Sequence, residues 1–336
     1  MTVTKFGIAV SIAIFSIAGD SLLNVAQASP PISTVTGPTH NRAVTRQITG
    51  AIQNRIEQRR VIRSLSNRDS TAGLDSDISS GLAAGDNGSG MAGWASFSLG
   101  DVKDNTAGLA YKSDINTYTV GIDYPFAANL LGGVSLSYEN TDVSSSIGTN
   151  SATDTDGYTI APYIAYQLDD TFSIDGSLGY SWSDIDQSRN NGTITGSTED
   201  DGYFFALNLN ALRWFDNFQV SGRLGYLYSK KVQDAFTESN ANVVAKSSNK
   251  LGQFQVGANL GYYMGNVMPY FGATYEYDHQ LTKVAGAAND DSGMVYVIGA
   301  NIFGSSGISG GLSYSMVNNR SRLDNDTFSA NIAVEF

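Results

Sequence analysis

Three arginines follow one another at intervals of four residues, at Arg55, Arg59 and Arg63. That spacing places their side chains on one face of an α-helix. A guanidinium is always charged and can bind a carboxylate through two parallel hydrogen bonds, so the stripe is suited to ion pairing in a polar interior. Acids that fall on the opposite face from the apolar residues of later strand-like segments are the expected partners: Asp123, Glu139, Asp175, Glu276 and Glu335.

A serine motif near the N-terminus invites a catalytic interpretation. Gly19-Asp20-Ser21-Leu22 matches the nucleophile motif of the GDSL esterases. A serine nucleophile needs a partnered base, however, and neither His40 nor His279 stands in the Asp-x-x-His setting that those enzymes use. We therefore expect no esterase activity.

Two further fragments could do chemistry. Asp278 and His279, with two more aspartates at 290–291, faintly resemble the aspartate and histidine site of the outer-membrane omptin proteases. Residues 154–157, Asp-x-Asp-Gly, look like part of a calcium loop but lack the remaining ligands. Neither fragment is complete, so we expect no catalytic residue, no cofactor and no metal.

The composition favours strands with two unlike faces. Charged residues make up only 15% of the chain, whereas glycine and tyrosine occur 36 and 18 times. The formal net charge of −12 argues against nucleic-acid binding, and the absence of cysteine excludes a disulfide framework. After the N-terminus no apolar run is long enough for a membrane-spanning helix, which excludes a multi-helix membrane protein.

The first residues have the pattern of a secretory signal peptide. Lys5 precedes an apolar run over residues 6–18, and Ala26 and Ala28 form an A-x-A cleavage site. We expect residues 1–28 to be removed during export through the general secretory route. The alternative is an anchor that is not cleaved.

The next part of the chain should hold one helix between two irregular segments. Three prolines predict an extended segment over 29–40, and small polar residues predict a linker over 66–90. Residues 41–65 have helical periodicity and contain six of the seven arginines between Arg42 and Arg68, against the single acid Glu57. So basic a helix before an acidic domain suggests that the helix sits inside it. The alternative is that most of the acids lie in solvated loops, and that the polar interior holds water with no specific partner for the arginines.

From residue 91 onward the chain alternates strand-like segments with turns that are short, then long, then short again. That alternation is typical of bacterial outer-membrane barrels, in which the turns on one side are tight and the loops on the other are long. Both barrel ends then lie on the periplasmic side, which requires an even number of strands. We expect twelve antiparallel strands in an all-β barrel, near 91–99, 115–124, 130–141, 156–167, 171–183, 202–215, 217–229, 250–264, 267–279, 292–303, 307–317 and 326–336.

Aromatic residues recur at a spacing that matches a lipid bilayer. Phe172 and Trp182 bracket one apolar strand face, and Phe218 and Tyr228 bracket another. Ten residues at about 3.3 Å each, tilted by roughly 40°, span about 25 Å, the height of the lipid-facing band of such barrels. These four residues are the expected aromatic girdle.

The last strand is amphipathic and stops on an aromatic residue. Phe328, Ile332, Val334 and Phe336 share its apolar face. A strand that closes a barrel in a bilayer has this pattern, because one face meets lipid and the other meets a wet lumen. We expect it to pair with residues 91–99.

Taken together, these features resemble the translocator domain of autotransporters, the type V secretion family. Residues 82–86 followed by Gly93-Trp94, and the Gly121-Ile122-Asp123-Tyr124 stretch, look like that family's entry to the barrel. The resemblance implies a monomeric barrel over 91–336 with the helix in its pore, in the outer membrane of a Gram-negative bacterium and with its long loops extracellular. It also implies periplasmic chaperones as partners, and a barrel-assembly machinery that reads the last strand.

The resemblance is incomplete at the N-terminus. Only twelve residues separate the signal from the expected helix, so we expect almost no passenger, and the helix lacks the asparagine pair at which some members cleave theirs. We expect a translocator or anchor barrel without catalytic activity. The alternatives are a channel plugged by its helix, or an adhesion protein that acts through its acidic surface loops.

Overall fold

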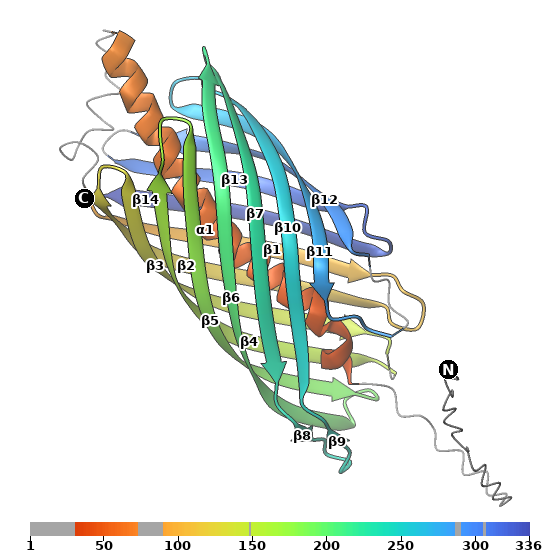
Figure 1. The fold of residues 1–336 in the computed structure, drawn as a ribbon. Coiled ribbons are helices and arrows are strands. Elements are labelled where there is room, and N and C mark those ends of the chain that lie inside the picture. The colour runs from red at the N-terminus through yellow and green to blue at the C-terminus, as the bar shows by residue number, and fades with distance from the viewer. Residues whose placement is uncertain (1–30, 73–89, 148, 286–289, 305–306) are drawn as a thin grey trace, which may run out of the picture.

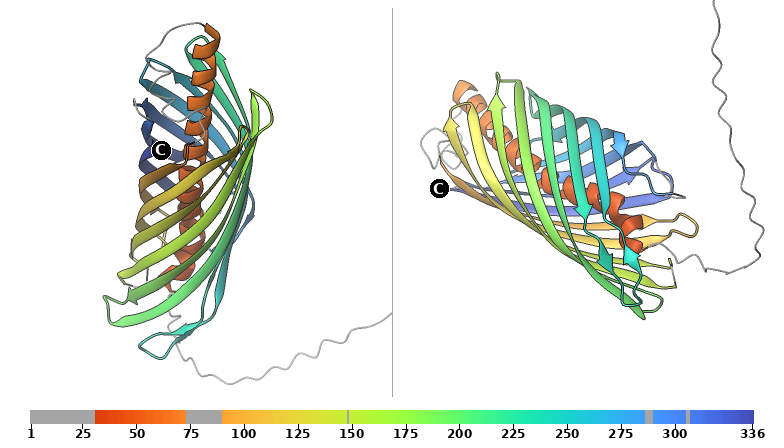
Figure 2. Two further views of the ribbon diagram at one scale, coloured as in Figure 1. Left: turned by 90° about the vertical axis from the view of Figure 1, so that its left-hand side faces the viewer. Right: turned by 60° about the horizontal axis from the view of Figure 1, so that its bottom comes forward.

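The computed structural model describes residues 31–72, 90–147, 149–285, 290–304 and 307–336. Twelve antiparallel strands form a closed barrel, and α1 runs through it (Figures 1 and 2). A separate pair, β8 and β9, extends from one end. The elements are α1 (Ile32–Ala72), β1 (Ala92–Asp104), β2 (Tyr111–Ala127), β3 (Leu130–Ser145), β4 (Ser151–Gln167), β5 (Phe172–Arg189), β6 (Ile194–Phe215), β7 (Phe218–Gln233), β8 (Phe236–Thr237), β9 (Val243–Val244), β10 (Ser247–Tyr262), β11 (Val267–Leu281), β12 (Ser292–Phe303), β13 (Ile308–Asn318) and β14 (Leu323–Glu335).

The first and last strands close the barrel, as the sequence predicts. β1 and β14 pair antiparallel from Ala92 opposite Glu335 to Asp104 opposite Leu323. The final residue continues this seam, because the Phe336 amide donates to the Met91 carbonyl at 2.9 Å. Closure leaves no free strand edge in the sheet, which is the condition for a sheet to exist in lipid.

Side chains alternate between a lipid-facing outside and a packed inside. Phe172, Trp182 and Phe218 are exposed on the outer surface, and Tyr228 is partly exposed there. Neighbouring inward positions carry threonine, serine, glutamine or charged residues that are nearly all buried. Because strand side chains alternate with a period of two, this arrangement follows directly from the sequence pattern.

The strands extend far beyond the predicted boundaries at one end. β6 begins at Ile194 and β5 ends at Arg189, so most of the predicted loop over 184–201 is paired strand. The predicted loop over 230–249 likewise contains strand extensions and the β8–β9 pair. The sequence prediction was wrong here because it relied on apolar alternation. Above the aromatic girdle both faces are polar, yet the ladder hydrogen bonds continue.

The helix is also longer than predicted. α1 begins at Ile32, so the expectation of an extended segment over 29–40 is wrong for residues 32–40. Pro38 lies inside the helix, where its missing N–H and ring normally disfavour helical structure. Packing overrides this penalty, because Ile32 and Val35 are buried within the barrel and Ser33 bonds to β5 and β7 through Gln187 and Gln233.

Residues 66–72 of the predicted linker are helical, whereas 73–89 lie outside the described residues, as does the predicted signal peptide. No helix among the described residues is long and apolar enough to cross a membrane.

Candidate functional site

The lumen is filled by α1, whose polar side chains meet those of the barrel wall along its length. At the end with the short turns, Arg55 Nε donates to Asp123 Oδ2 at 2.7 Å, and Arg59 Nη2 donates to Asp123 Oδ1 at 2.7 Å. Arg59 also lies 3.0 Å from Glu335 on the last strand. Asp123 is 2% exposed, so one buried carboxylate holds two helix arginines.

A second layer of side chains positions Asp123. Tyr163 Oη donates to Asp123 Oδ2 at 3.4 Å, and Trp94 Nε1 donates to Tyr163 Oη at 2.8 Å. Two glycines make room for these rings: a Cβ on Gly121 would lie 2.4 Å from the Trp94 ring, and one on Gly133 would lie 2.4 Å from the Tyr163 ring. The glycines therefore leave the space beside the wall that the two rings occupy, packed edge to face at 6.2 Å.

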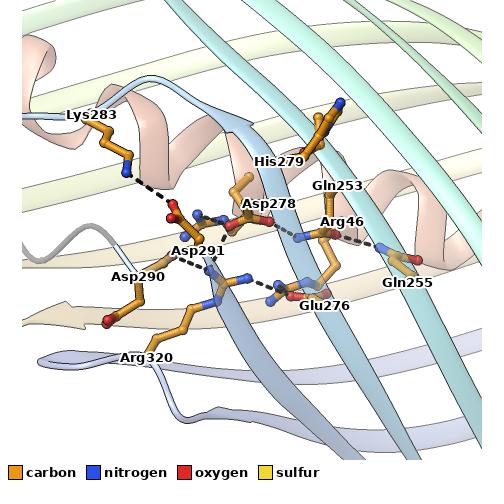
Figure 3. Close-up of polar contacts among 12 residues, drawn as sticks. Arg46, Gln253, Gln255, Glu276, Asp278, His279, Lys283, Asp290, Asp291 and Arg320 are labelled. Atoms are coloured by element: carbon orange, nitrogen blue, oxygen red, sulfur yellow. Dashed lines mark hydrogen bonds and ion pairs between the residues drawn. The ribbon is translucent and has the colours of Figure 1, made fainter.

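At the opposite end α1 meets an arginine–carboxylate cluster (Figure 3). Arg42 Nη2 donates to Asp278 Oδ2 at 2.5 Å, and Arg46 Nη2 donates to Glu276 Oε2 at 2.5 Å. Arg320, from the hairpin between β13 and β14, donates to the same two carboxylates at 2.8 and 3.1 Å. The helix and an outer hairpin thus share two acids of β11.

Sequence reasoning missed Arg42, Arg46 and Arg320 as site residues. Arg42 and Arg46 stand four residues apart, the same signal that identified the stripe at Arg55 and Arg59. Arg320 carries no such signal, because it follows β13 in what looks like an ordinary polar loop.

The remaining predicted contacts are made with other partners. Glu139 lies 2.9 Å from His40 Nε2 and 3.8 Å from Lys231 Nζ, with no helix arginine beside it. Asp175 accepts hydrogen bonds from Asn208 and Asn210 at 2.7 and 2.5 Å. Arg63 is exposed and forms no ion pair with the described residues. The prediction of Arg63 as a lumen contact was wrong, because Arg63 lies on the exposed side of the helix while Ile62 and Leu65 beside it pack against the barrel wall.

The protease-like fragment does not form a site. Asp278 points into the lumen, whereas His279, the next residue on the same strand, points outward against Tyr226 and Phe254 (Figure 3). Adjacent strand residues face opposite sides of the sheet, so these two groups cannot act together. In the described ranges no cluster of three or more His, Cys, Asp or Glu side chains could hold a metal ion.

Small cavities lie between the helix and the barrel wall among the described residues. Two cavities of about 30 and 20 Å³ lie beside its first turns, the larger lined by Arg42 and Arg320 and the smaller by His40 and Lys231. Such volumes hold one or two water molecules. The arrangement is therefore a barrel closed by an ion-paired helix, and its chemistry is charge pairing.

Comparison with known proteins agrees with this geometry. The chain resembles the translocator domain of the autotransporter NalP from Neisseria meningitidis, at 17% identity and a TM-score of 0.64 over 88% of this chain and 99% of that one. It also resembles the beta domain of the Bordetella autotransporter BrkA, at 18% identity and 0.61 over 74% and 100%.

A third solved structure, the transport unit of AIDA-I from Escherichia coli, matches at 13% identity and a TM-score of 0.52 over 73% of this chain and 90% of that one. No curated protein matches the sequence significantly. The family model for the autotransporter beta-domain matches residues 88–315, well over half of the chain. The chain belongs to the autotransporter beta-domain family.

Proposed function

We propose that this protein is an outer-membrane translocator and anchor barrel that is kept closed by α1, with the N-terminal end of α1 at the outer face. Family members are outer-membrane proteins of Gram-negative bacteria, and the aromatic girdle described above suits that location. We propose no catalytic role.

The direction of the helix supports this function. Its N-terminal end lies at the barrel end that carries the long strand extensions and β8–β9, and its C-terminal end emerges beside the short turns and Phe336 (Figure 1). A chain that has passed through the pore from the periplasm would leave its helix in this orientation, with the N-terminal end outside and the C-terminal end at the periplasmic side. We therefore assign the long hairpins to the outside.

The export and assembly steps belong to the same proposal. A signal peptide at 1–28 would direct the chain to the periplasm, where chaperones would keep it soluble. The barrel-assembly machinery would then recognise Phe328, Ile332, Val334 and Phe336, whose side chains are all exposed on the lipid-facing side of the last strand. We expect the inserted barrel to be a monomer, because it closes on itself.

The observation that carries the proposal is that Arg42, Arg46, Arg55 and Arg59 each pair with a lumen carboxylate. An ion pair inside a packed pore holds only if both partners stay, since separating them leaves buried charges without compensation. An open channel, the main alternative from the sequence, would need a continuous water path, and the packing around α1 disfavours one.

Single-channel recording in planar bilayers tests the proposal. Wild type should be closed, because α1 occupies the lumen. Replacing Arg55 and Arg59 together by glutamate places both against Asp123 and should produce frequent openings. Arg63→Glu, on the same helix stripe but exposed, should stay closed like wild type. A large steady conductance of the wild-type protein would instead support the channel function.

A further inference from the structure

The outer surface carries two pairs of lysines that face each other directly across neighbouring strands. Lys103 on β1 is opposite Lys112 on β2, and Lys230 on β7 is opposite Lys250 on β10. Like charges at directly opposite positions repel and destabilise a sheet unless something neutralises them. Each pair therefore requires a neutralising negative charge nearby.

The first pair is neutralised by the protein itself. Lys103 Nζ lies 2.8 Å from Asp101, and Lys112 Nζ lies 3.3 Å from Asp101 and 3.0 Å from Asp114. Both aspartates share the outward face with the lysines. These exposed ion pairs cancel the local charge, so no external partner is required.

The second pair has no such neutralisation. Within the described part of the chain, neither Lys230 nor Lys250 forms an ion pair. The nearby carboxylates are engaged elsewhere: Asp201, diagonal to Lys230 on β6, accepts a hydrogen bond from Tyr180 Oη at 3.0 Å, Asp234 pairs with Lys246 at 2.7 Å, and Asp291 pairs with Lys283 at 3.3 Å. Two ammonium groups thus project side by side from the barrel wall without a protein anion between them.

These lysines stand at the edge of the lipid-facing band. Lys230 is directly opposite Tyr203, whose exposed ring lies 6.1 Å from that of the girdle residue Tyr228, and Tyr228 is the next outward residue below Lys230. Aromatic side chains of such girdles lie at the level of the lipid headgroups. The two ammonium groups therefore lie where lipid phosphates lie.

The surface below the pair is flat and aromatic. Two residues along β10 from Lys250, Gly252 leaves room for the His279 ring, which a Cβ at that glycine would approach to 2.3 Å. His279 packs on Phe254 and Tyr226 at ring separations of 5.2 and 5.6 Å. A sugar or acyl chain attached to a phosphate could lie on this platform.

Elsewhere the outward face carries a row of acidic residues, two outward positions beyond Trp182 on β5. Six aspartates occupy consecutive opposite positions across β14, β1, β2, β3, β4 and β5, all on the outward face. This row ends on β5, and β6 with its exposed Asp201 lies between it and the basic pair on β7 and β10. The aspartates of this row are Asp326, Asp101, Asp114, Asp142, Asp154 and Asp186.

We propose that Lys230 and Lys250 bind the phosphate of a phosphorylated glycolipid in the outer leaflet, with the aromatic platform under His279 supporting its sugar. This inference rests on the outward orientation assigned to the long hairpins. The binding itself does not depend on a closed pore, so a failure of the conductance experiment and a failure of lipid binding are distinguishable.

The test is native mass spectrometry of the full-length barrel in neutral detergent, titrated with diphosphorylated lipid A. A lysine near an anionic lipid contributes about 1 kcal/mol, so the Lys230→Gln, Lys250→Gln double variant should bind roughly 30-fold more weakly. The matched control is Lys103→Gln, Lys112→Gln, which removes the same charge from the neutralised pair and should bind like wild type. Conversion to Arg at 230 and 250 should restore binding.

Three results would overturn the proposal. The glutamine variants of both pairs could lose binding equally, which would mean that only net charge matters. Dephosphorylated lipid A could bind wild type as tightly as the phosphorylated form. Inorganic phosphate alone could compete with lipid A at equal concentration, which would identify a free-anion site. The heat-induced shift in electrophoretic mobility of each variant verifies that its barrel is folded.

Discussion

At the scale of single residues, the barrel interior contains two kinds of buried carboxylate. One kind binds the helix, and the other binds only side chains of neighbouring strands. Asp123 accepts from Arg55 and Arg59, whereas Asp175 accepts from the neutral amides of Asn208 and Asn210. Both acids are almost fully buried. Their removal should therefore have different consequences.

We predict that Asp123→Asn destabilises the barrel by about 3 kcal/mol or more, because it leaves two buried arginines facing one remaining acid, Glu335. Urea unfolding in lipid vesicles measures this. Asp175→Asn is the control and should cost about 1 kcal/mol, since its amide oxygen keeps one of the two hydrogen bonds that Asp175 accepts from Asn208 and Asn210 and only the other is lost. Equal losses would show that Asp123 does not anchor the helix.

Arg320 belongs to the arginine–carboxylate cluster at the other end of the helix. It binds Glu276 and Asp278, which also bind Arg46 and Arg42, so three guanidinium groups share two carboxylates. The outer hairpin therefore supplies each of these two carboxylates with a second positive charge beside the one from the helix. Substitutions of Arg46 and Arg320 should not be additive, because both act on Glu276.

At the scale of elements, the strands continue past the membrane as a polar sheet that carries a row of like charges. Asp154 on β4 stands opposite Asp142 on β3 and Asp186 on β5, two outward positions beyond Tyr158, which stacks on the girdle residue Trp182. Partial burial raises the pKa of Asp154, and the hydrogen bond with Asp142 and the charge of that residue raise it further. Asp169, in the short turn before β5, shows the reverse: amides of Phe172 and Thr171 lower its pKa.

These opposite shifts predict opposite pH dependences. A carboxyl whose pKa is raised on folding binds protons more tightly in the folded state, so its contribution to stability increases as pH falls from neutral through the folded pKa. Asp154→Asn should remove that increase. Asp169 should contribute to stability above its unfolded pKa, and this contribution is lost as pH falls through its folded pKa. Asp169→Asn should remove that contribution. Unfolding midpoints between pH 3 and 7 measure both, and slopes of the same sign would contradict the assignment.

At the scale of the whole molecule, closure depends on the two terminal strands finding each other. Phe336 is 68% exposed, so its ring adds little to packing within the protein, while its amide bonds to Met91 across the seam. The ring is therefore available to lipid and to assembly factors. Its contribution should appear in assembly more than in the stability of the finished barrel.

We predict that Phe336→Ser lowers the amount of barrel in the outer membrane and leaves aggregates in the periplasm, because the last strand is then recognised poorly. Cell fractionation with immunoblotting measures this. Phe172→Ser is the matched control: it removes an exposed aromatic at the same barrel end but away from the terminus, and should assemble nearly normally. Normal levels of the Phe336 variant would refute a role of this residue in assembly.

The sequence by itself determined the barrel, because its signals are local. Alternation with a period of two assigns each residue to lipid or lumen without knowledge of its neighbours, and Phe172 with Trp182 marks the height of the bilayer. Antiparallel hairpins with alternating turn lengths then lead to twelve strands and a closing seam. The inward position of Asp123 follows from the same parity.

Only the tertiary structure decided which charges meet. Whether Arg55 contacts Asp123 or Glu139 depends on the height and rotation of α1 in the lumen, and these are set by all contacts of the helix together. For the same reason Pro38 lies in a helix that its own preference opposes, and Arg320 reaches inward from a hairpin that looks like a surface loop. The local sequence pattern determines which side of the sheet a residue faces, whereas packing over the whole barrel determines which residue it contacts.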